Sequence, residues 1–300
     1  MELICTGEEE NEMKKFYSPL RYPGGKSKLA KFIGLLCEKN QINDKDGHYV
    51  EPYAGGASVA LFLLFNGYVS EVTINDSDRS IYAFWYAVLH RTEKFISKIQ
   101  RTKIDEKTWR RFREIQRNKD EASLFDLGFS TFFLNRTNVS GIIDGGMIGG
   151  FAQKGTYKID CRFNKRELIQ RIQTIASHKK NIHLYNLDAL DLIKKIGEEL
   201  SGRATIFYFD PPYYLKGESL YLNFYDHSDH EDVSKAIRNI KNSRWVVSYD
   251  AANEIKDLYK GYKKIEYSLL HTAHTARMGE EVLFFSKNMS VPRISDPTRA

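Results

Sequence analysis

The sequence predicts an α/β fold with a mostly helical lobe inserted into it. Three observations support this prediction. The apolar run 206–209 is typical of a buried strand and ends at Asp210. Residues 48–62 have the pattern of a short strand, a glycine turn and a helix. Between residues 80 and 180 helical patterns follow one another without a strand of the parallel kind, so the alternation of strands and helices is interrupted there.

Composition restricts the kind of protein. With 300 residues, 42% of them hydrophobic, the chain can form one large core or a core with an inserted lobe. No apolar run approaches the ~20 residues of a membrane span, and the first residues lack the pattern of a signal peptide. We therefore expect a cytoplasmic protein without membrane contact. The cysteines Cys5, Cys37 and Cys161 lack metal-ligand spacing, so we expect no metal site.

A glycine turn precedes the first helix, which is predicted over about 27–40. Its Gly-Gly-Lys-Ser string suggests the phosphate-binding loop of nucleotide hydrolases. That motif needs a glycine five residues before Gly25, where this chain has Leu20, so the loop is excluded. What remains is a turn that can seat a carboxylate and stack an adenine-like ring.

A second strand, 71–75, ends in the acidic string Asp76-Ser77-Asp78. An acid at the end of the second strand of such a unit is well placed for ribose hydroxyls. An acid directly before a helix can also cap it. We expect Asp76 to bind a ligand and Asp78 to cap the following helix.

The positive charge is concentrated in one segment. Residues 91–120 hold eleven Lys and Arg and five Asp and Glu, and this excess of six equals the net charge of +6 of the whole chain. A local basic stripe is what binding of phosphates needs, although a solvated helix face of mixed charge is a common alternative. We favour contact with nucleic acid and expect it at Arg110, Arg111 and Arg113.

The segment 132–151 contains five glycines and cannot be regular throughout. Loops of this length in compact domains are usually functional or disordered. We expect a hairpin or loop suited to a DNA groove, with Asn135, Arg136, Asn138 and Ser140 in contact with DNA.

After this lobe, strands and helices alternate again. The sequence predicts a helix over 164–178, a strand over 181–185, a helix to residue 200, the strand before Asp210, a helix over about 229–242, a strand over 245–249 and a β pair over 262–270 and 281–286. Ser228 and Glu231 fit a capping box. His227 and His230 are therefore interpreted as helix-start residues rather than metal ligands.

The stretch 206–214 combines features of a base-binding site. Two prolines, Pro211 and Pro212, fix φ and remove two backbone donors after Asp210. The resulting stiff turn has free carbonyl groups and carries an aromatic ring, Tyr213, beside a carboxylate. This suits a planar base with an exocyclic amino group, which stacks on the ring and donates to Asp210 and to the Pro211 carbonyl.

Taken in order, the motifs resemble a known family. They are Tyr22-Pro23-Gly24-Gly25-Lys26, Glu51-Pro52-Tyr53-Ala54-Gly55-Gly56, Asn75-Asp76, Leu134-Asn135-Arg136, Asp210-Pro211-Pro212-Tyr213 and Glu280-Glu281-Val282-Leu283. From about residue 17 to 285 the chain is similar to the Dam-like adenine-specific DNA methyltransferases, the α-ordered branch. The resemblance implies a Rossmann-like seven-stranded methyltransferase sheet with an inserted, mostly helical target-recognition lobe.

The resemblance also implies an organisation and residue roles. The catalytic domain is expected over 17–90 and 180–287, the DNA-recognition lobe over 91–179, and loose tails over 1–16 and 288–300. Residues expected at the cofactor, S-adenosylmethionine, are Tyr22, Gly24, Gly25, Lys26, Glu51, Pro52, Tyr53, Gly55, Gly56, Asp76, Asp188 and Asp210. The flipped adenine is expected at Asp210, Pro211, Pro212 and Tyr213.

The expected substrate is adenine in double-stranded DNA. We expect a monomeric enzyme with a cognate restriction endonuclease as its partner. Tyr22 and Tyr53 stand where many relatives carry Trp and Phe, and both keep an aromatic ring. Three alternatives stay open. The amino group of cytosine is chemically similar, although enzymes acting on it more often carry Ser at the position of Asp210. An RNA substrate and an inert DNA-binding module are the others.

Overall fold

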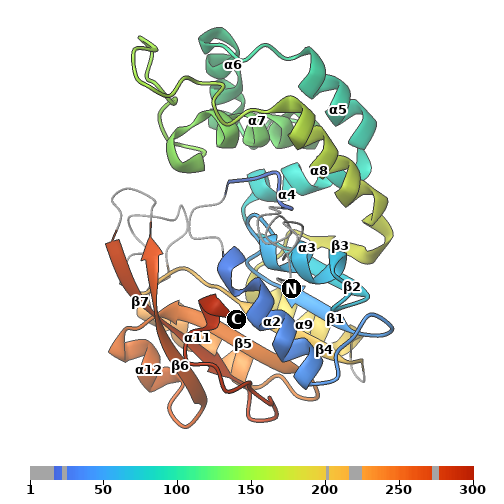
Figure 1. The fold of residues 1–300 in the computed structure, drawn as a ribbon, viewed down its shortest axis with the longest axis vertical. Coiled ribbons are helices and arrows are strands. Elements are labelled where there is room, and N and C mark those ends of the chain that lie inside the picture. Colours follow the sequence, from blue (N-terminus) through green and yellow to red (C-terminus); the bar gives the residue numbers. More distant parts are fainter. Residues whose placement is uncertain (1–16, 22–25, 201–202, 216–224, 272–276) are drawn as a thin grey trace, which may run out of the picture.

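The described residues form a seven-stranded mixed sheet. The computed structural model describes residues 17–21, 26–200, 203–215, 225–271 and 277–300. The strand order is β3-β2-β1-β4-β5-β7-β6 (Figure 1), with β7 antiparallel to β5 and β6 and the other neighbouring pairs parallel. The strands are β1 (His48–Glu51), β2 (Glu71–Asn75), β3 (Ile182–Tyr185), β4 (Thr205–Phe209), β5 (Arg244–Asp250), β6 (Lys263–His271) and β7 (Arg277–Phe285). The predicted Rossmann-like fold class is confirmed.

Helices cover both faces of this sheet. Side chains of α2 and α3 pack on one face, and side chains of α9, α11 and α12 pack on the other. The helices are α2 (Ala30–Lys39), α3 (Ser58–Phe65), α4 (Arg79–His90), α5 (Thr92–Arg101), α6 (Glu106–Arg117), α7 (Leu124–Thr137), α8 (Lys165–Ser177), α9 (Ala189–Glu199), α11 (His227–Arg238) and α12 (Asn253–Leu258). Short 3₁₀ turns are η1 (Ser27–Leu29), η2 (Val139–Gly141), η3 (Lys179–Asn181) and η4 (Pro297–Arg299).

Strand β4 shows why the sheet needs two layers of helices. All of its residues are buried. Ile206 and Tyr208 belong to the core cluster of α2 and α3, whereas Phe207 and Phe209 belong to the cluster of α9, α11 and α12. Because successive side chains of a strand point to opposite faces, a central strand covered on both sides needs a continuous apolar run. This confirms the strand predicted before Asp210.

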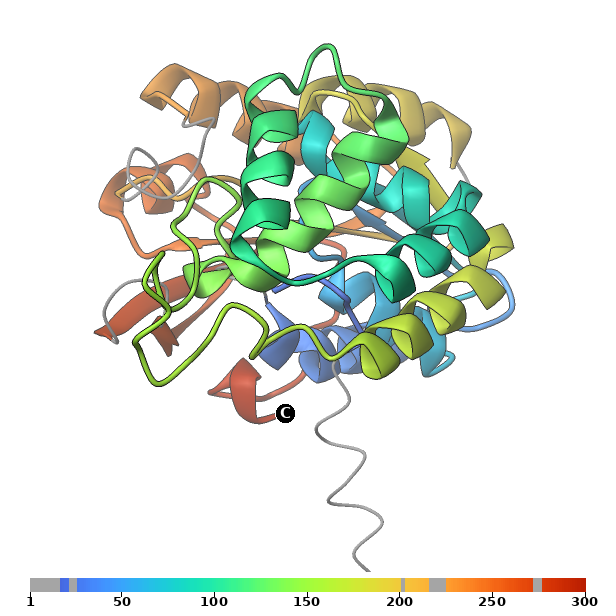
Figure 2. The same ribbon diagram turned by 90° about the horizontal axis from the view of Figure 1, so that it is seen from above.

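Helices α4 to α8 form the inserted lobe between β2 and β3. Figure 1 shows the lobe at one end of the molecule, with α4 nearest the sheet and α5 and α6 at the far end. Seen from above, α7 runs between α5 and α6 (Figure 2). The ring of Phe132 on α7 lies 6.1 Å from Phe84 of α4 and 5.3 Å from Phe95 of α5, so aromatic packing joins the three helices.

The C-terminal residues 288–300 are packed rather than loose, which corrects the prediction of a tail there. Met289 and Val291 are buried. The amide of Asn40, at the end of α2, accepts from the Ser290 N–H at 2.8 Å and donates to the Ser290 carbonyl at 2.8 Å. A single buried amide thus fixes this segment with two hydrogen bonds. The other predicted tail, 1–16, lies outside the described residues.

The predicted start of α11 was wrong by two residues. The N-cap is Asp226, not Ser228, and Ser228 lies inside the first turn. Asp226 accepts from the Asp229 N–H at 2.9 Å while Asp229 accepts from the Asp226 N–H at 2.9 Å. The capping box is therefore formed by Asp226 and Asp229, not by Ser228 and Glu231 as the sequence pattern predicted.

Among the described residues, none of the helices has both the length and the apolarity that crossing a bilayer requires.

A buried histidine makes the fold sensitive to acid. His48 on β1 contacts Thr73 through Nε2 at 2.8 Å, and its ring stacks on His183 with centroids 5.5 Å apart. Burial, followed by the nearby charges of His183 and Arg203, lowers the pKa of His48 from 6.5 to about 4, against the opposing effect of Glu71. The folded protein therefore holds this imidazole neutral.

We predict that the protein loses stability as the pH falls from about 6.5 to about 4. In this pH range the unfolded chain binds a proton at His48 and the folded chain does not. Lower pH favours unfolding wherever the unfolded state binds more protons than the folded state. At about 1.4 kcal/mol per pKa unit, the fall from 6.5 to about 4 corresponds to about 3 kcal/mol. Urea unfolding of wild type and His48→Gln across this range measures the effect.

The His48→Gln variant should lose less stability between the two pH values than wild type, whatever its stability at neutral pH. His90→Gln is the matched control because His90 is exposed at the end of α4 and is not one of the groups that shift the pKa of His48. An equal loss in wild type and His48→Gln would exclude His48 as the source.

Candidate active site

The candidate active site lies at the carboxyl end of β4, in the middle of the sheet. Asp210 follows the strand directly, between the ends of β1 and β5. Its Oδ1 accepts from the Ser248 hydroxyl on β5 at 2.6 Å, and Ser248 in turn accepts from the Tyr208 hydroxyl at 3.1 Å. The side chain of Asp210 is 18% exposed. The carboxylate is thus fixed from the sheet side and reaches the surface at the ligand-binding edge of an α/β sheet.

Lys26 is the closest cation to this carboxylate among the described residues. Its Nζ lies 3.0 Å from Asp210 Oδ1 and donates to the Tyr213 hydroxyl at 2.7 Å, and it lies 3.9 Å from Glu281 Oε1. The Lys26 side chain is only 2% exposed. Lys26 was expected at the cofactor from the sequence, and the structure places it beside Asp210 and Tyr213, two residues expected at the adenine.

Glu281 on β7 completes the buried network. Its Oε1 accepts from the Tyr213 hydroxyl, and its Oε2 accepts from the Tyr267 hydroxyl on β6 at 2.6 Å. Glu281 was recognised in the sequence only as part of a motif, without a role. No local signal indicates that role, because its partners Lys26 and Tyr213 are 255 and 68 positions away.

The ammonium group decides the ionisation of this cluster. Burial lowers the pKa of Lys26, but the Asp210 carboxylate, followed by Tyr213 and Glu281, raises it well above 10.5. Burial raises the pKa of Asp210 above 3.8, while Lys26 and the Ser248 hydrogen bond lower it. Since a buried lysine with a carboxylate at 3.0 Å keeps its proton, Lys26 is charged and favours the ionised form of Asp210.

The turn after Asp210 is held by a second acid that the sequence did not reveal. Asp250, at the end of β5, accepts from the backbone N–H groups of Tyr214 at 2.9 Å and Leu215 at 2.8 Å. Pro211 and Pro212 remove two donors from the turn. Tyr213 is 3% exposed and is anchored by its hydroxyl. The Asp-Pro-Pro-Tyr turn is therefore rigid on both sides of its prolines.

A second group of acids surrounds the end of β1. Glu51 is buried, and its Oε2 has no hydrogen-bond partner among the described residues. Burial, then the charges of Asp210 and Asp76, raise the pKa of Glu51 well above 4.5, against a backbone hydrogen bond from Ala60. An orphaned buried carboxyl oxygen is costly in the protein alone. It indicates a place for a cationic ligand.

Asp76 joins the ends of β1 and β2. One carboxylate oxygen accepts from the Gly55 N–H at 2.9 Å and the other from the Asp78 N–H at 2.9 Å. Burial raises the pKa of Asp76 from 3.8 to about 7, the backbone hydrogen bond of Asp78 opposing it. Asp78 accepts from the Ser80 N–H at 2.8 Å and caps α4, as predicted.

The glycine turn before α3 is tight, and the remaining expected cofactor residues lie around it. Gly55 has φ of 46° and Ala57 has φ of 47°, so the chain passes twice through the left-handed region before the helix. Asn75 donates to the Pro52 carbonyl at 2.9 Å, which ties this turn to β2. Asp188 caps α9 and is exposed. β1, β2 and β3 are neighbours in the sheet, so residues expected at the cofactor lie together at the ends of these strands.

Other residues expected at the cofactor are Tyr53, Gly56, Tyr22, Gly24 and Gly25. The Tyr53 hydroxyl lies 3.1 Å from the Tyr225 hydroxyl, and Gly56 is buried in the turn. Tyr22, Gly24 and Gly25 lie outside the described residues. In the part of the chain that the structure describes, no group of three or more His, Cys, Asp or Glu side chains has a metal-binding arrangement.

Three of the residues expected to touch DNA are instead buried at the end of α7. Asn135 accepts from the Arg21 N–H at 2.7 Å and donates to the carbonyls of Arg21 at 2.9 Å and Gly141 at 2.8 Å. Arg136 Nε donates to the Pro19 carbonyl at 2.6 Å. Asn138 accepts from Trp109 Nε1 at 2.6 Å.

These contacts place the three side chains in the interior, whereas the sequence predicted them at the surface in contact with DNA. They fix the segment 19–21 and the loop after α7. The two segments are so close at Gly141 that a Cβ there would lie 2.2 Å from the Arg21 carbonyl oxygen. The φ of Gly141 is +77°, which also favours glycine at this position.

Of the three arginines expected to touch DNA, one holds a loop of the protein and two are exposed. Arg113 donates to the carbonyls of Ile143 at 2.7 Å and Asp144 at 2.8 Å, so it also holds the loop. Arg110 is exposed, pairs with Glu106 at 2.7 Å and lies over the Phe151 ring. Arg111 is exposed on α6, and Ser140 is half-buried in η2. Arg110, Arg111 and Ser140 keep surface positions.

Comparison with known proteins was made by family, sequence and structure. Residues 22–275 match the family model described as D12 class N6 adenine-specific DNA methyltransferase. The chain is 23% identical over 239 residues to the Type II methyltransferase M.MjaIII of Methanocaldococcus jannaschii, covering 75% of this chain and 78% of that protein.

Two solved structures show weak likeness. The rRNA methyltransferase aviRa of Streptomyces viridochromogenes has a TM-score of 0.43 at 13% identity, with 94% of both chains covered. A SAM-dependent methyltransferase of Agrobacterium tumefaciens has a TM-score of 0.40 at 11% identity, covering 87% of this chain and 62% of that one.

We predict that Asn135→Ala lowers the free energy of unfolding by about 2–3 kcal/mol. The substitution leaves the backbone groups of Arg21 and Gly141 without partners in the interior, and each unsatisfied group costs about 1–3 kcal/mol. Chemical denaturation measures this. Asn118→Ala, an exposed asparagine whose bonds stay within one turn of α6, should change stability by less than about 0.5 kcal/mol. Full stability of Asn135→Ala with impaired DNA binding would instead support the direct contact predicted from the sequence.

Proposed function

We propose that the chain, which belongs to the D12 class of N6 adenine-specific DNA methyltransferases, turns its target adenine out of the duplex and receives it at the Asp210 turn. The observation that supports this is an ionised carboxylate beside a Pro-Pro turn at the carboxyl end of a central strand. The reaction of the family is transfer of a methyl group to the 6-amino nitrogen of adenine in DNA. The steps below concern the residues that perform it here.

The residues at the ends of β1, β2 and β3 fit S-adenosylmethionine, the methyl donor of the reaction. Glu51, with its unpartnered buried oxygen, would hold a cationic group of the cofactor. The Gly55–Gly56 turn would lie against it, and Asp76 and Asp188 would take its hydroxyl and amino groups. When bound, the cofactor supplies an electrophilic methyl group on a sulfonium.

A base inside the duplex cannot reach Asp210. Turning it out costs a few kcal/mol, and stacking on an aromatic ring is worth ~1–3 kcal/mol per base. Tyr213 is the aromatic residue of the turn, and its hydroxyl is fixed by Lys26 and Glu281. Because Tyr213 is 3% exposed and Lys26 Nζ lies 4.9 Å from the centre of its ring, stacking of a base on this ring requires neighbouring groups to move off one of its faces.

Asp210 and the Pro211 carbonyl would accept the two amino hydrogens of the adenine. This favours a pyramidal nitrogen whose lone pair points to the methyl group, because both hydrogens are then held on the opposite side. When the nitrogen gains the methyl group, it would lose one of these hydrogens as a proton, through the Asp210 carboxylate to solvent. Lys26 keeps Asp210 ionised and therefore an acceptor. Correct placement of nitrogen and methyl group supplies a large part of the rate.

The setting of the reaction is part of the proposal. We propose double-stranded DNA as substrate, a monomeric cytoplasmic enzyme, and a cognate restriction endonuclease as its counterpart. The name of the relative from Methanocaldococcus jannaschii as a Type II methyltransferase supports this last point. Cytosine is the competing base, because its amino group has similar chemistry. The carboxylate of Asp210 in place of the Ser more frequent in cytosine-amino enzymes favours adenine.

The test is methylation of plasmid DNA by the purified protein and S-adenosylmethionine, read by base-resolved sequencing. We predict modified adenine in one short sequence context. Asp210→Ala should lose methylation by at least ~100-fold, since the acceptor of the amino group is removed. Cofactor binding to that variant, measured by calorimetry, should only weaken. Modified cytosine, or near-normal turnover by Asp210→Ala, would refute the proposal.

We predict that Lys26→Met shifts the acidic limb of the pH profile of kcat/KM to higher pH. Lys26 lowers the pKa of Asp210, and loss of an adjacent opposite charge raises the pKa of a carboxyl group. Asp210 then becomes protonated, and unable to accept both hydrogen bonds, at a higher pH than in wild type. Lys28→Met, an exposed lysine two residues away, is the control. An unshifted profile in Lys26→Met would mean that Lys26 only stabilises the fold.

A further inference from the structure

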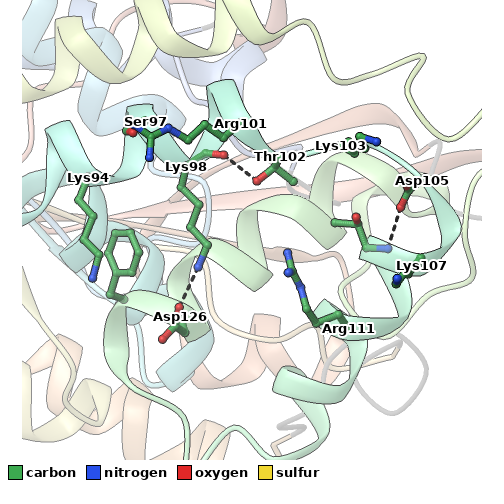
Figure 3. A pocket seen from close by; sticks show the side chains of 12 residues that line it. Lys94, Ser97, Lys98, Arg101, Thr102, Lys103, Asp105, Lys107, Arg111 and Asp126 are labelled. Carbon is green, nitrogen blue, oxygen red and sulfur yellow. Dashed lines mark hydrogen bonds and ion pairs between the residues drawn. The ribbon is translucent and has the colours of Figure 1, made fainter.

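Two buried carboxylates share one ammonium group at the Asp210 site. Lys26 Nζ lies 3.0 Å from Asp210 Oδ1 and 3.9 Å from Glu281 Oε1. The Lys26 and Glu281 side chains are fully enclosed, and that of Asp210 is mostly buried. The partly exposed pair of Lys98 and Asp126, between α5 and α7, shows the ordinary case of one acid for one base (Figure 3). Among the described residues, the buried cluster of Asp210, Lys26 and Glu281 instead holds two acids and one base.

The hydrogen bonds of Glu281 are those of an ionised carboxylate. Its Oε1 accepts from the Tyr213 hydroxyl, and its Oε2 accepts from the Tyr267 hydroxyl at 2.6 Å. The Tyr213 hydroxyl accepts from the Lys26 ammonium at 2.7 Å, which directs its own proton to Glu281. A protonated carboxyl group carries a donor on one oxygen, whereas a carboxylate accepts at both. The cluster therefore has a net charge of one negative unit.

Glu281 changes what the pair of Lys26 and Asp210 offers to a substrate. An ammonium 3.0 Å from a carboxylate cancels most of its field at a point outside the pair. A second carboxylate, 3.9 Å from the same ammonium, restores a net negative charge to the cluster. Because buried charges are screened much less than exposed ones, this charge acts on groups that bind beside Asp210.

The reaction moves positive charge towards this cluster. The amino nitrogen of the adenine forms its bond to the methyl carbon with its lone pair, and the electron pair of the broken carbon–sulfur bond stays on sulfur. The nitrogen gains the positive charge that sulfur loses, and keeps it until one amino hydrogen leaves as a proton. In the proposed function this nitrogen lies against Asp210. A net negative charge there stabilises the transition state more than the bound reactants.

We propose that Glu281 is a positioning residue for methyl transfer, which holds Lys26 through the Tyr213 hydroxyl and offsets its charge so that Asp210 presents a negative field to the adenine nitrogen. The inference rests on the proposed function and adds to it a side chain that acts through Lys26. The competing explanation is that Glu281 only anchors Tyr213 and Tyr267 in the fold. Variants that change charge with little change of shape separate the two.

The main test is a cycle of charge changes. Glu281→Gln removes one negative charge, Lys26→Met removes the positive charge, and the double variant has the same net charge as wild type. We expect kcat to fall by at least ~10-fold in Glu281→Gln, since the stabilisation of developing charge is lost. The double variant should have a higher kcat than Glu281→Gln, although it lacks more of the buried contacts. All rates are compared at a pH above the acidic limb of each profile.

The control is Glu266→Gln. Glu266 on β6 also pairs with lysines, Lys256 at 2.8 Å and Lys264 at 2.7 Å, but it is exposed. This variant removes the same charge at the surface, and its kcat should equal that of wild type. Urea unfolding of every variant establishes that each is folded under the assay conditions.

The pH profile separates the proposed role from a change in the ionisation of Asp210. Burial, and then Glu281, raises the pKa of Asp210, against the effects of Lys26 and Ser248. Loss of the Glu281 charge therefore lowers this pKa, and the acidic limb of kcat/KM should move to lower pH, opposite to the shift in Lys26→Met. Glu281→Gln thus keeps Asp210 ionised over a wider pH range and still turns over more slowly. Loss of an anchor in the fold predicts no such shift.

Cofactor binding gives a readout that does not depend on turnover. Calorimetry compares the Kd of S-adenosylmethionine, whose sulfur is charged, with the Kd of S-adenosylhomocysteine, whose sulfur is neutral. We expect the ratio of the two Kd values to be the same in Glu281→Gln as in wild type, because the charge of Glu281 acts at the nitrogen. A changed ratio with an unaffected kcat would place its role at the cofactor and overturn the proposal.

Other outcomes also decide the question. Unchanged kcat in folded Glu281→Gln, or a double variant slower than both single variants, would show that Glu281 only stabilises the fold. If Glu281→Gln does not fold, the double variant is compared with Lys26→Met, and its acidic limb should lie at lower pH; coinciding profiles would overturn the proposal. Methylation of adenine by wild type and its loss in Asp210→Ala are scored independently. A protein that passes those tests and fails these comparisons refutes the role of Glu281 and not the proposed function.

Discussion

The ion pair between Lys26 and Asp210 is the interaction on which the site depends. A carboxylate and an ammonium in the interior each cost several kcal/mol of desolvation, which their attraction repays only with good geometry and further hydrogen bonds. Here the separation is 3.0 Å, and Ser248 and Tyr213 take part in the same network. The pair also joins the beginning of the chain to the middle of the sheet. Removing either partner would leave the other as an uncompensated buried charge.

The same N-terminal segment links the lobe to this pair. Asn135 and Arg136, at the end of α7, bind the backbone of Arg21 and Pro19, and Arg171 of α8 donates to the Ser18 carbonyl at 2.9 Å. Lys26 follows a few residues later. The inserted lobe and the residue that favours the ionised form of Asp210 are therefore close to one another along the chain. Buried polar side chains in the lobe serve this connection rather than contact with DNA.

Sequence patterns predicted the features that depend on neighbouring residues. The apolar run before Asp210 and the acid before α4 follow local rules, and the structure confirms both. The polar run Asn135–Asn138 gave the wrong indication because polar residues at a helix end suggest exposure. Their partners, Arg21, Pro19 and Trp109, come from other parts of the chain. The hydrophobic periodicity of a sequence gives no information about contacts between residues so far apart along the chain.

The same limit applies to the site. The Asp-Pro-Pro-Tyr turn is recognisable because its residues are adjacent, whereas Asp250 and Glu281 support it from β5 and β7. Glu281 begins a predicted strand and Asp250 directly follows another, but the partners of both residues depend on the order of strands in the sheet. In a parallel sheet, strands distant in sequence end at one edge. Supporting residues of this kind become visible only when the topology is known.

Charge is divided between the two parts of the molecule in a way that suits two different ligands. Residues 91–120 account for the whole excess of +6, so the remaining residues carry as many acids as bases. The acids Glu51, Asp76 and Asp210 are concentrated at the sheet edge, where desolvation raises their pKa values and a cationic ligand is favoured. Most cations of the segment 91–120 are exposed instead. Salt screens exposed charges over about 8–10 Å but affects buried ones much less. Under the proposed function, attraction of DNA to these cations would therefore be sensitive to ionic strength, whereas the electrostatics of the buried acids would be set by burial.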